Sequence, residues 1–215
     1  MTSRRDFFGI LGAGAALPAL APFPTSASLP PIRADYDMSW VDQVTKPHKV
    51  VFDAPEVNDG GAVWRAVLLQ EEYQQVYGTF PDQMSMVLVI RHFGIAMGMA
   101  HAFWEKEGVG EQTKTKGRGG EWATRNPVGP PADDARPGAA RYTIPGFLAS
   151  GGIVLGCDLA FNNMVVGKYR TEGMSRADAR ELALKDLLPG VILQPSGFFA
   201  TIRAQQAGCA VFFNG

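Results

Sequence analysis

Short apolar runs, each about the length of one strand, recur along this chain between longer stretches with helical periodicity. The central run is Ile153-Val154-Leu155, which two glycines precede and Gly156-Cys157-Asp158 follow. An apolar run this short, bounded by glycines, predicts a strand that is buried on both faces of a sheet. Similar runs occupy residues 48–53, 84–90, 191–194 and 210–213. Strands that alternate with helices predict a single three-layer α/β domain, whose mostly parallel sheet of about five strands is flanked by helices.

Apolar residues at spacings of three and four predict the helices of this domain. These helices cover residues 62–77, 94–107, 142–149, 159–169, 175–188 and 198–207. Ser175 is the expected N-cap of its helix. The helix expected over residues 94–107 is apolar nearly all round, which favours burial on two sides or a contact between subunits. A helix that packs on the sheet beneath a loop explains the pattern equally well.

The first residues, 1–27, have the layout of a signal peptide. Arg4-Arg5 form a twin-arginine pattern, an apolar stretch follows, and small residues end the segment. Pro18 and Pro22 interrupt the apolar stretch, so we expect no stable membrane span. A chance arginine pair in a cytosolic protein is the alternative, but it does not explain the ordered three-part layout. The sequence therefore predicts export to the periplasm by the twin-arginine translocase.

The rest of the chain divides into a lead-in segment and one domain. Residues 28–47 are rich in proline and have few periodic positions, so they predict a segment that packs over the domain without joining the sheet. The domain covers residues 48–215, with an insertion at 108–141 in which glycines and prolines mix with charges. A loop this long is usually a lid, a partner surface or a mobile insertion. Trp122 suggests that part of it docks on the domain.

The charge balance and the cysteine count exclude several classes of protein. The chain has 20 basic and 21 acidic residues and a net charge of -1, which gives no support for nucleic-acid binding or a polybasic membrane contact. Two cysteines are too few for a disulfide scaffold. Cys209 precedes the last strand and Cys157 ends the third. Because these positions lie at opposite edges of a parallel sheet, we expect no disulfide between them.

Three turns follow strands of the predicted parallel sheet, so right-handed crossovers bring them to one edge, where α/β proteins collect their ligands. Cys157 stands there close to a helix N-terminus, a setting in which thiols become reactive. The other interpretation is a small buried hydrophobe, which is what most free cysteines are. The candidate catalytic residues are Cys157, His92 and Ser196, and the candidate ligand-binding residues are Gly156, Asp158, Gly197 and Arg91. We expect no metal site and no cofactor among them.

Two common enzyme signatures are missing from this edge. The turn Pro195-Ser196-Gly197 lacks the G-x-S-x-G pattern of a hydrolase nucleophile elbow. The chain also contains no phosphate-binding loop, and Gly60-Gly61 alone does not argue for a nucleotide. A hydrolase and a nucleotide-dependent enzyme are therefore disfavoured.

Several segments together resemble the DsrE-like family of sulfur-relay proteins. They are Lys49–Asp53, Val89–Gly94, the strand-ending Cys157, Asp186–Val191, Gln194–Phe199 and Arg203–Ala210. The resemblance implies a small α/β domain that often forms homo- or hetero-oligomers. It also implies that the cysteine matching Cys157 accepts a persulfide and passes it to a partner protein. Export and the insertion at 108–141 both depart from the compact cytoplasmic members of the family.

The sequence leaves three functions open. In the first, Cys157 carries a persulfide between a sulfur-donor and a sulfur-acceptor protein, with His92 as proton donor or acceptor and Ser196 as a hydrogen-bonding group. In the second, the chain is a binding module for a small ligand, a metal or haem, because His92, Met97, Met99 and His101 lie within ten residues and Met97 and His101 share a helix face. In the third, the chain is an oligomeric interaction subunit without chemistry of its own.

Overall fold

The computed structural model describes residues 36–78, 81–117, 119–133 and 135–214. The expected signal peptide and the first part of the lead-in segment lie outside these described residues. Within them, the five runs predicted as strands form β1 (His48–Ala54), β2 (Met84–Ile90), β3 (Ile153–Cys157), β4 (Val191–Gln194) and β5 (Ala210–Phe213). All pairings are parallel, in the order β4-β3-β2-β1-β5. The predicted α/β fold with a parallel five-stranded sheet is confirmed.

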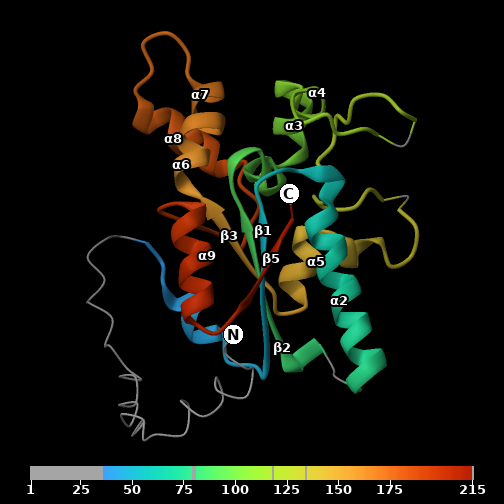
Figure 1. Ribbon diagram of the computed structural model, residues 1–215. Helices are drawn as coiled ribbons and strands as arrows, with labels where there is room; N and C mark the ends of the chain where they lie inside the picture. The colour runs from blue at the N-terminus through green and yellow to red at the C-terminus, as the bar shows by residue number, and fades with distance from the viewer. Residues whose placement is uncertain (1–35, 79–80, 118, 134, 215) are drawn as a thin grey trace, which may run out of the picture. The chain divides into compact units, whose positions relative to one another are not determined.

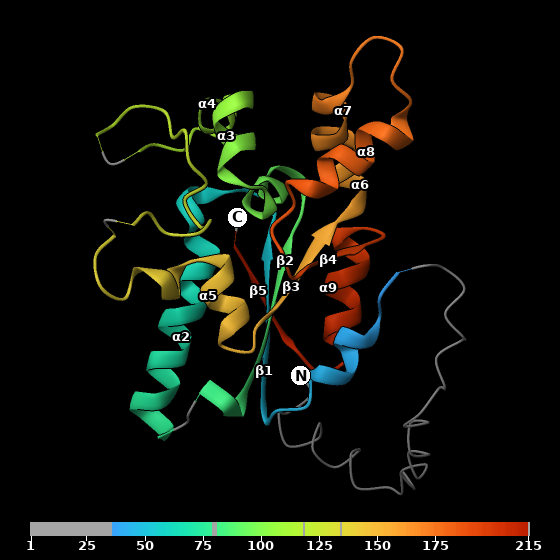
Figure 2. The same cartoon turned by 180° about the vertical axis from the view of Figure 1, so that it is seen from behind.

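Figure 1 shows this sheet edge-on with β5 toward the viewer. Figure 2 shows it from behind, where β4 at the other edge of the sheet comes into view. The strands run upward in Figure 1, so their carboxyl ends meet at the top. Helix α9 (Gly197–Gln206) covers one face, and α2 (Gly61–Tyr77) and α5 (Ile144–Ala149) cover the other. The remaining long connections gather above the carboxyl ends. This arrangement is the three-layer architecture expected from the sequence.

Alternating strand residues supply the two cores. Phe52, Leu88 and Val154 belong to the larger core on the α2 side, whereas Val51 and Leu155 belong to the smaller core on the α9 side. Both faces of the central strands are thus buried, which explains why their sequences are continuous apolar runs. Trp40, from the short 3-10 helix η1 (Ser39–Gln43), is fully buried in the smaller core.

The path of the chain explains why α9 lies alone among the long helices on its face. From β1 to β4 each new strand is added at the same side of the sheet, but the connection from β4 returns to the opposite edge. Right-handed crossovers then require the helix of the returning connection to cross the other face. Consequently α9 packs on the face that α2 and α5 leave free.

Shorter elements form the upper part of the molecule. They are η4 (His92–Gly98), α3 (His101–Glu107), α4 (Val109–Gln112), α6 (Asp158–Ala160), η6 (Phe161–Val165), α7 (Val166–Tyr169) and α8 (Arg176–Lys185). The short helix η5 (Ala139–Tyr142) lies beside α5 and α2 instead. The 3-10 turns η2 (Asn58–Gly60) and η3 (Pro81–Gln83) precede α2 and β2. The segment η6 is a π-helical turn within the helix expected over residues 159–169. Ser175 caps α8 as predicted, because its Oγ accepts the Asp178 N–H at 3.1 Å. No helix among the described residues is long and apolar enough to cross a membrane.

The single helix expected over residues 94–107 is wrong. The chain forms a 3-10 helix, η4, breaks at Met99-Ala100, and starts again as α3. The break occurs because this stretch pairs with the segment after α8: Leu188 N–H donates to Gly98 O and Ala100 N–H donates to Asp186 O, each at 2.8 Å. Tertiary pairing therefore replaces the helical hydrogen bonds that the apolar periodicity suggested.

The insertion docks through residues other than Trp122. Trp122 is partly exposed and lies against Lys116 of the same insertion. Asn126 and Val128 are buried instead, and the Asn126 amide donates to the carbonyls of Met97 and Met99 at 2.7 Å each. Asn126 thus holds the broken stretch between η4 and α3 in place.

We expect Asn126→Ala to lower the free energy of unfolding by at least about 2 kcal/mol, because it leaves two buried carbonyls and the Val128 N–H without partners. Urea unfolding checks this value. Asn163→Ala, at an exposed position in η6, is the matched control and should change stability by less than about 0.5 kcal/mol. Equal effects of the two substitutions would contradict the structural role of Asn126.

Candidate functional site

The carboxyl ends of β3 and β4 lie where the chain departs to opposite faces of the sheet. After β3 it enters α6, η6 and α7, whose buried residues join the larger core. After β4 it enters α9, which packs on the smaller core. Neighbouring strands whose connections diverge in this way form the crevice where open α/β sheets usually bind ligands. Cys157 and Gln194 are register partners at these two strand ends. The topology therefore puts the thiol at the position in this sheet best suited to a site.

Cys157 itself is 5% exposed. It is the N-cap residue of α6, and its Sγ accepts the backbone N–H of Ala160 at 3.3 Å. The charge of Arg91 is within electrostatic reach of the thiol. The sulfur is therefore placed beside a hydrogen-bond donor, at the start of a helix and within reach of a positive charge.

Arg91, the first residue after β2, forms a two-pronged ion pair with Asp53 of β1. Its Nε lies 2.7 Å from Asp53 Oδ1 and its second terminal nitrogen lies 3.1 Å from Oδ2. These hydrogen bonds raise the pKa of Arg91, against a smaller opposing effect of burial. Arg91 therefore stays charged, and the fork geometry fixes where its charge lies.

Aromatic rings and a glycine enclose the Arg91 side chain. The guanidinium carbon lies 5.4 Å from the ring centroid of Phe198 in α9 and 6.0 Å from that of Phe213 in β5. A Cβ at Gly197 would come within 2.5 Å of the Arg91 side chain. Gly197, expected to bind a ligand, thus makes room for Arg91.

Asp158 is held on both carboxylate oxygens. Arg180 of α8 makes an ion pair with Oδ1 at 2.7 Å, out of line for a hydrogen bond, and the Tyr36 hydroxyl donates to Oδ2 at 3.1 Å. Partial burial and the negative charge of Asp158 raise the pKa of Tyr36, so its hydroxyl remains a donor. Asp158, the residue directly after Cys157, thereby links this strand end to Arg180 of α8 and to Tyr36 at the start of the described chain.

Gln194 is a fully buried polar residue beside Cys157. Its Nε2 donates to the carbonyls of Asp37 at 2.8 Å and Leu193 at 3.1 Å, which fixes the orientation of the amide. Its Oε1 is buried and has no hydrogen-bond partner within the described part of the chain. Since buried acceptors are rarely left unpaired, Gln194 offers an acceptor to a donor group that enters this end of the sheet.

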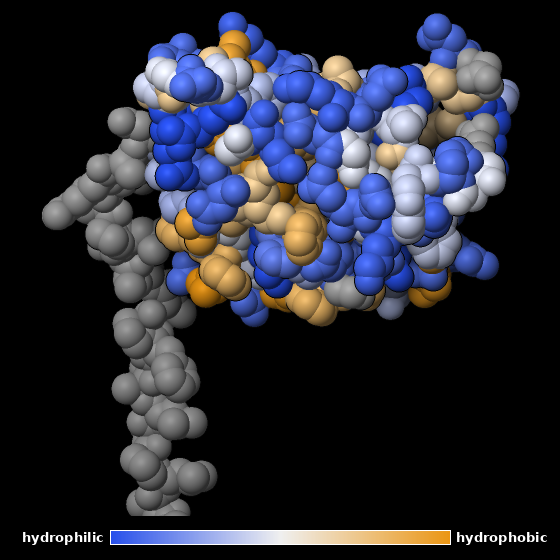
Figure 3. All heavy atoms as spheres, turned by 90° about the horizontal axis from the view of Figure 1, so that it is seen from above, coloured by the Kyte–Doolittle hydropathy of each residue, from blue (hydrophilic) through white to orange (hydrophobic). Residues whose placement is uncertain are grey.

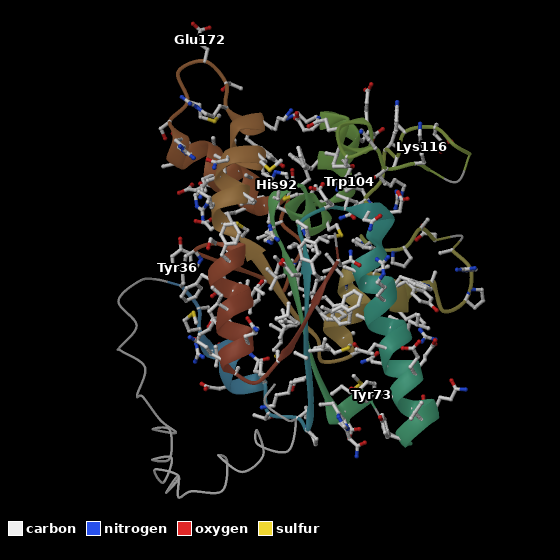
Figure 4. All side chains as sticks on the ribbon, in the orientation of Figure 1. Tyr36, Tyr73, His92, Trp104, Lys116 and Glu172 are labelled. Atoms are coloured by element: carbon white, nitrogen blue, oxygen red, sulfur yellow. The ribbon has the colours of Figure 1, made fainter. Side chains whose placement is uncertain are left out.

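His92 and Ser196 have partners other than Cys157. His92 has a positive φ of 48° and its Nδ1 lies 3.1 Å from Glu56 Oε1. Figure 4 places it above the strand ends. Ser196 caps α9, and its Oγ accepts the Phe199 N–H at 3.1 Å. The structure therefore brings Arg91 and Gln194 to Cys157 and gives Ser196 a capping role.

Gly156 has a packing role as well. A Cβ at this position would come within 2.9 Å of Leu193 and 3.3 Å of Ile95. The missing side chain lets η4 lie close against the ends of β3 and β4. A small hollow of about 40 Å³ lies farther along η4, lined by residues of α3, α4 and η6 but not by Cys157.

The histidine and methionine residues of the binding-module alternative do not converge. Met97 and Met99 are fully buried core residues, and they do not share a helix with His101. His101 accepts the Asn126 N–H through Nδ1 at 3.1 Å, and its Nε2 lies 2.8 Å from the Pro130 carbonyl. Across the described residues, no group of three or more His, Cys, Asp or Glu side chains is placed to hold a metal ion. The expected helix face of Met97 and His101 is thus wrong.

Both cysteines are free thiols. Cys209 directly precedes β5 and therefore lies at the amino ends of the strands, whereas Cys157 lies at their carboxyl ends. Burial raises the pKa of Cys209, and Lys49 only partly opposes this effect. At neutral pH Cys209 is therefore protonated, and its thiol has neither the helix N-terminus nor the guanidinium that Cys157 has.

Sequence reasoning did not single out Asp53, Gln194 or Tyr36. The first two had a signal, because each is a polar residue within or at the end of a run otherwise made of apolar residues. Tyr36 had none, since its contact with Asp158 joins residues 122 positions apart.

A scan against models of protein families finds none that matches the chain, and a search of curated proteins finds no similar sequence. The resemblance to the DsrE-like family therefore stays a prediction.

We expect Arg91→Lys to lower the free energy of unfolding by about 1–3 kcal/mol, because an ammonium cannot make both hydrogen bonds to Asp53. Thermal and urea unfolding measure the effect. Arg125→Lys, at an exposed position, is the control and should be close to neutral. A neutral Arg91→Lys would show that the Asp53 pair is not a structural element of this edge.

We also expect Tyr36→Phe to speed alkylation of Cys157 by about fivefold, the factor that corresponds to a lost hydrogen bond of about 1 kcal/mol. Tyr36 binds Asp158 and the Asp37 carbonyl binds Gln194, so this segment holds the two neighbours of Cys157. Loosening it should open the thiol to reagent. Tyr77→Phe, which changes an exposed ring in α2, should leave the rate unchanged; a rate equal to that of wild type in both variants would refute the idea.

Proposed function

We propose that the chain is a DsrE-like sulfur carrier that works through Cys157, after export to the periplasm by the twin-arginine pathway. The observation that supports this most is the surroundings of the Cys157 sulfur. It accepts the Ala160 N–H at the start of a helix, within reach of the Arg91 charge, at the diverging ends of β3 and β4. These groups favour the anionic sulfur that a persulfide carrier needs in both its empty and its loaded state.

The proposed loading step is a thiol exchange. The Cys157 thiolate attacks the outer sulfur of a donor persulfide, R–S–SH; a new S–S bond forms at Cys157 and the S–S bond of the donor breaks. The proton passes from the transferred outer sulfur to the leaving R–S⁻, so the donor leaves as R–SH and Cys157 carries an anionic persulfide. Unloading is the same exchange toward an acceptor nucleophile. Neither step consumes an oxidant or a reductant, so no cofactor is required.

The chain's own residues have distinct roles in this proposal. The Ala160 N–H and the charge of Arg91 stabilise negative sulfur, and Asp53 holds Arg91 in position. Gln194 Oε1 accepts a hydrogen bond from the molecule that delivers the sulfur or from the molecule that receives it. His92 is exposed and lies beside Glu56, so it can donate or accept a proton only at the rim of the site.

The burial of Cys157 requires an opening step. At 5% exposure the thiol is reached only when the segment of Tyr36 and Asp37, or the turn before α9, moves. A carrier benefits from this arrangement because a buried persulfide is protected from other thiols until a partner protein docks.

To test the proposal, the protein is treated with a low-molecular-weight persulfide, freed of excess reagent, and exposed to cyanide. Wild type and Cys209→Ala should each gain one sulfur atom per chain by intact mass and then release it as thiocyanate. Cys157→Ala should do neither. The two alanine variants are matched, since each removes one buried thiol.

Equal sulfur uptake by Cys157→Ala and wild type would contradict the carrier function. Failure of every form to take up sulfur would also contradict it, because a small reagent needs only transient opening of the site and no docked partner protein.

A second function, that of an interaction subunit, is favoured by one specific observation. Large apolar side chains of α9 and β5 are exposed at one edge of the sheet. Such patches usually mark contacts with another protein. Nothing in this alternative requires Cys157 to react, so the sulfur-uptake experiment separates the two.

A further inference from the structure

The β5 edge of the sheet is apolar, and no other strand of the described residues pairs with its outer side. The strand ends the sheet order, so its backbone pairs with β1 on one side only. All four of its residues, Ala210–Phe213, are exposed. In Figure 3, which looks down on the carboxyl ends, apolar side chains gather along the lower margin, on the side of β5.

Exposed apolar side chains flank this edge on both faces. Val211 and Phe213 pair in register with Val51 and Asp53, on the face that α9 covers, where Phe198 and Ile202 of α9 are also exposed. Phe212 lies on the other face, with its ring 5.5 Å from that of Phe52. An apolar rim on both faces is what a sheet needs in order to continue across an edge.

The exposed fractions of these side chains are large. They are 63% for Phe198, 55% for Ile202, 42% for Val211, 43% for Phe212 and 62% for Phe213. Together these largely apolar residues present roughly 500 Å² of surface, taking about 200 Å² for one fully exposed aromatic residue. This is more than half of the ~800 Å² that each partner buries in a standard interface.

Although β5 is short, with four residues, it lacks three other features that keep edge strands apart. The sequence Ala-Val-Phe-Phe contains no charge and no proline, and β5 pairs with β1 without a bulge. Two charged groups flank the strand on the α9 face: Arg91, which Asp53 neutralises, and Lys49, whose Nζ donates to the Ala207 carbonyl at 3.2 Å before β5 begins. No residue of β5 itself therefore repels a second copy of the strand.

We infer that β5 is a homodimer interface, in which two copies of this chain pair antiparallel through β5 around a twofold axis. The outward N–H and C=O groups of each strand bond to the other, and Phe198, Ile202, Val211 and Phe213 of one copy pack on those of the next. A second copy fits because a neutral, apolar edge is complementary to itself, as a twofold interface requires. This inference deepens the second proposed function, that of an interaction subunit, and does not require Cys157 to carry sulfur.

The test is the mass of the full chain in solution as a function of concentration, by sedimentation or light scattering. Wild type should have twice the 23.2 kDa of one chain at micromolar concentration. Val211→Lys places a charge on the edge and should raise the dimer dissociation constant at least about tenfold. Ile202→Glu changes α9 alone and leaves β5 intact, so it should weaken the dimer without affecting the strand.

Val76→Lys is the matched control, because it makes the same substitution at an exposed position at the end of α2. It should leave the dimer unchanged. Amide hydrogen exchange adds a direct readout: the β5 amides that point away from β1 should become protected as wild-type concentration rises.

A wild type that stays monomeric at all concentrations overturns the inference. A dimer that Val211→Lys and Ile202→Glu leave intact also overturns it, because another surface must then hold the copies together.

Discussion

The ion pair between Arg91 and Asp53 is the interaction on which the candidate site depends. It joins the ends of β1 and β2, and its two hydrogen bonds fix a positive charge at the carboxyl edge of the sheet. Phe198, Phe213 and the missing side chain of Gly197 fit around the same guanidinium. One charged group thus couples the start of α9, the end of β5 and the surroundings of Cys157.

The topology explains why the remaining polar groups converge there. In an all-parallel sheet every strand delivers its last residue to the same edge, and the change of face between β3 and β4 leaves a crevice at that edge. Cys157 and Gln194 occupy it as register partners. Tyr36 and Asp37 hydrogen-bond to Asp158 and Gln194, the sequence neighbour and the register partner of Cys157, and the thiol is almost fully buried.

The strands and the place of the candidate site could be predicted from sequence. Strands buried on both faces have continuous apolar sequences, and the carboxyl ends of parallel strands lie at the same end of the sheet. The positions of Cys157 and Arg91 followed from that rule alone. The roles of Ser196 and Gly197 did not, because a cap and a close contact depend on where α9 begins. The break at Met99 could not be predicted either: it depends on pairing with a segment nearly ninety residues later, which local periodicity does not record.

The central claim is that the surroundings of Cys157, at the carboxyl ends of the strands, make it the reactive thiol, and that Cys209 is not. Competitive alkylation of the folded wild-type protein near neutral pH, with each cysteine quantified by peptide mapping, tests it most directly. The account predicts that Cys157 is modified first, and that Cys209, whose pKa burial raises, reacts only after unfolding or at higher pH. Modification of Cys209 at the same rate or faster would contradict it.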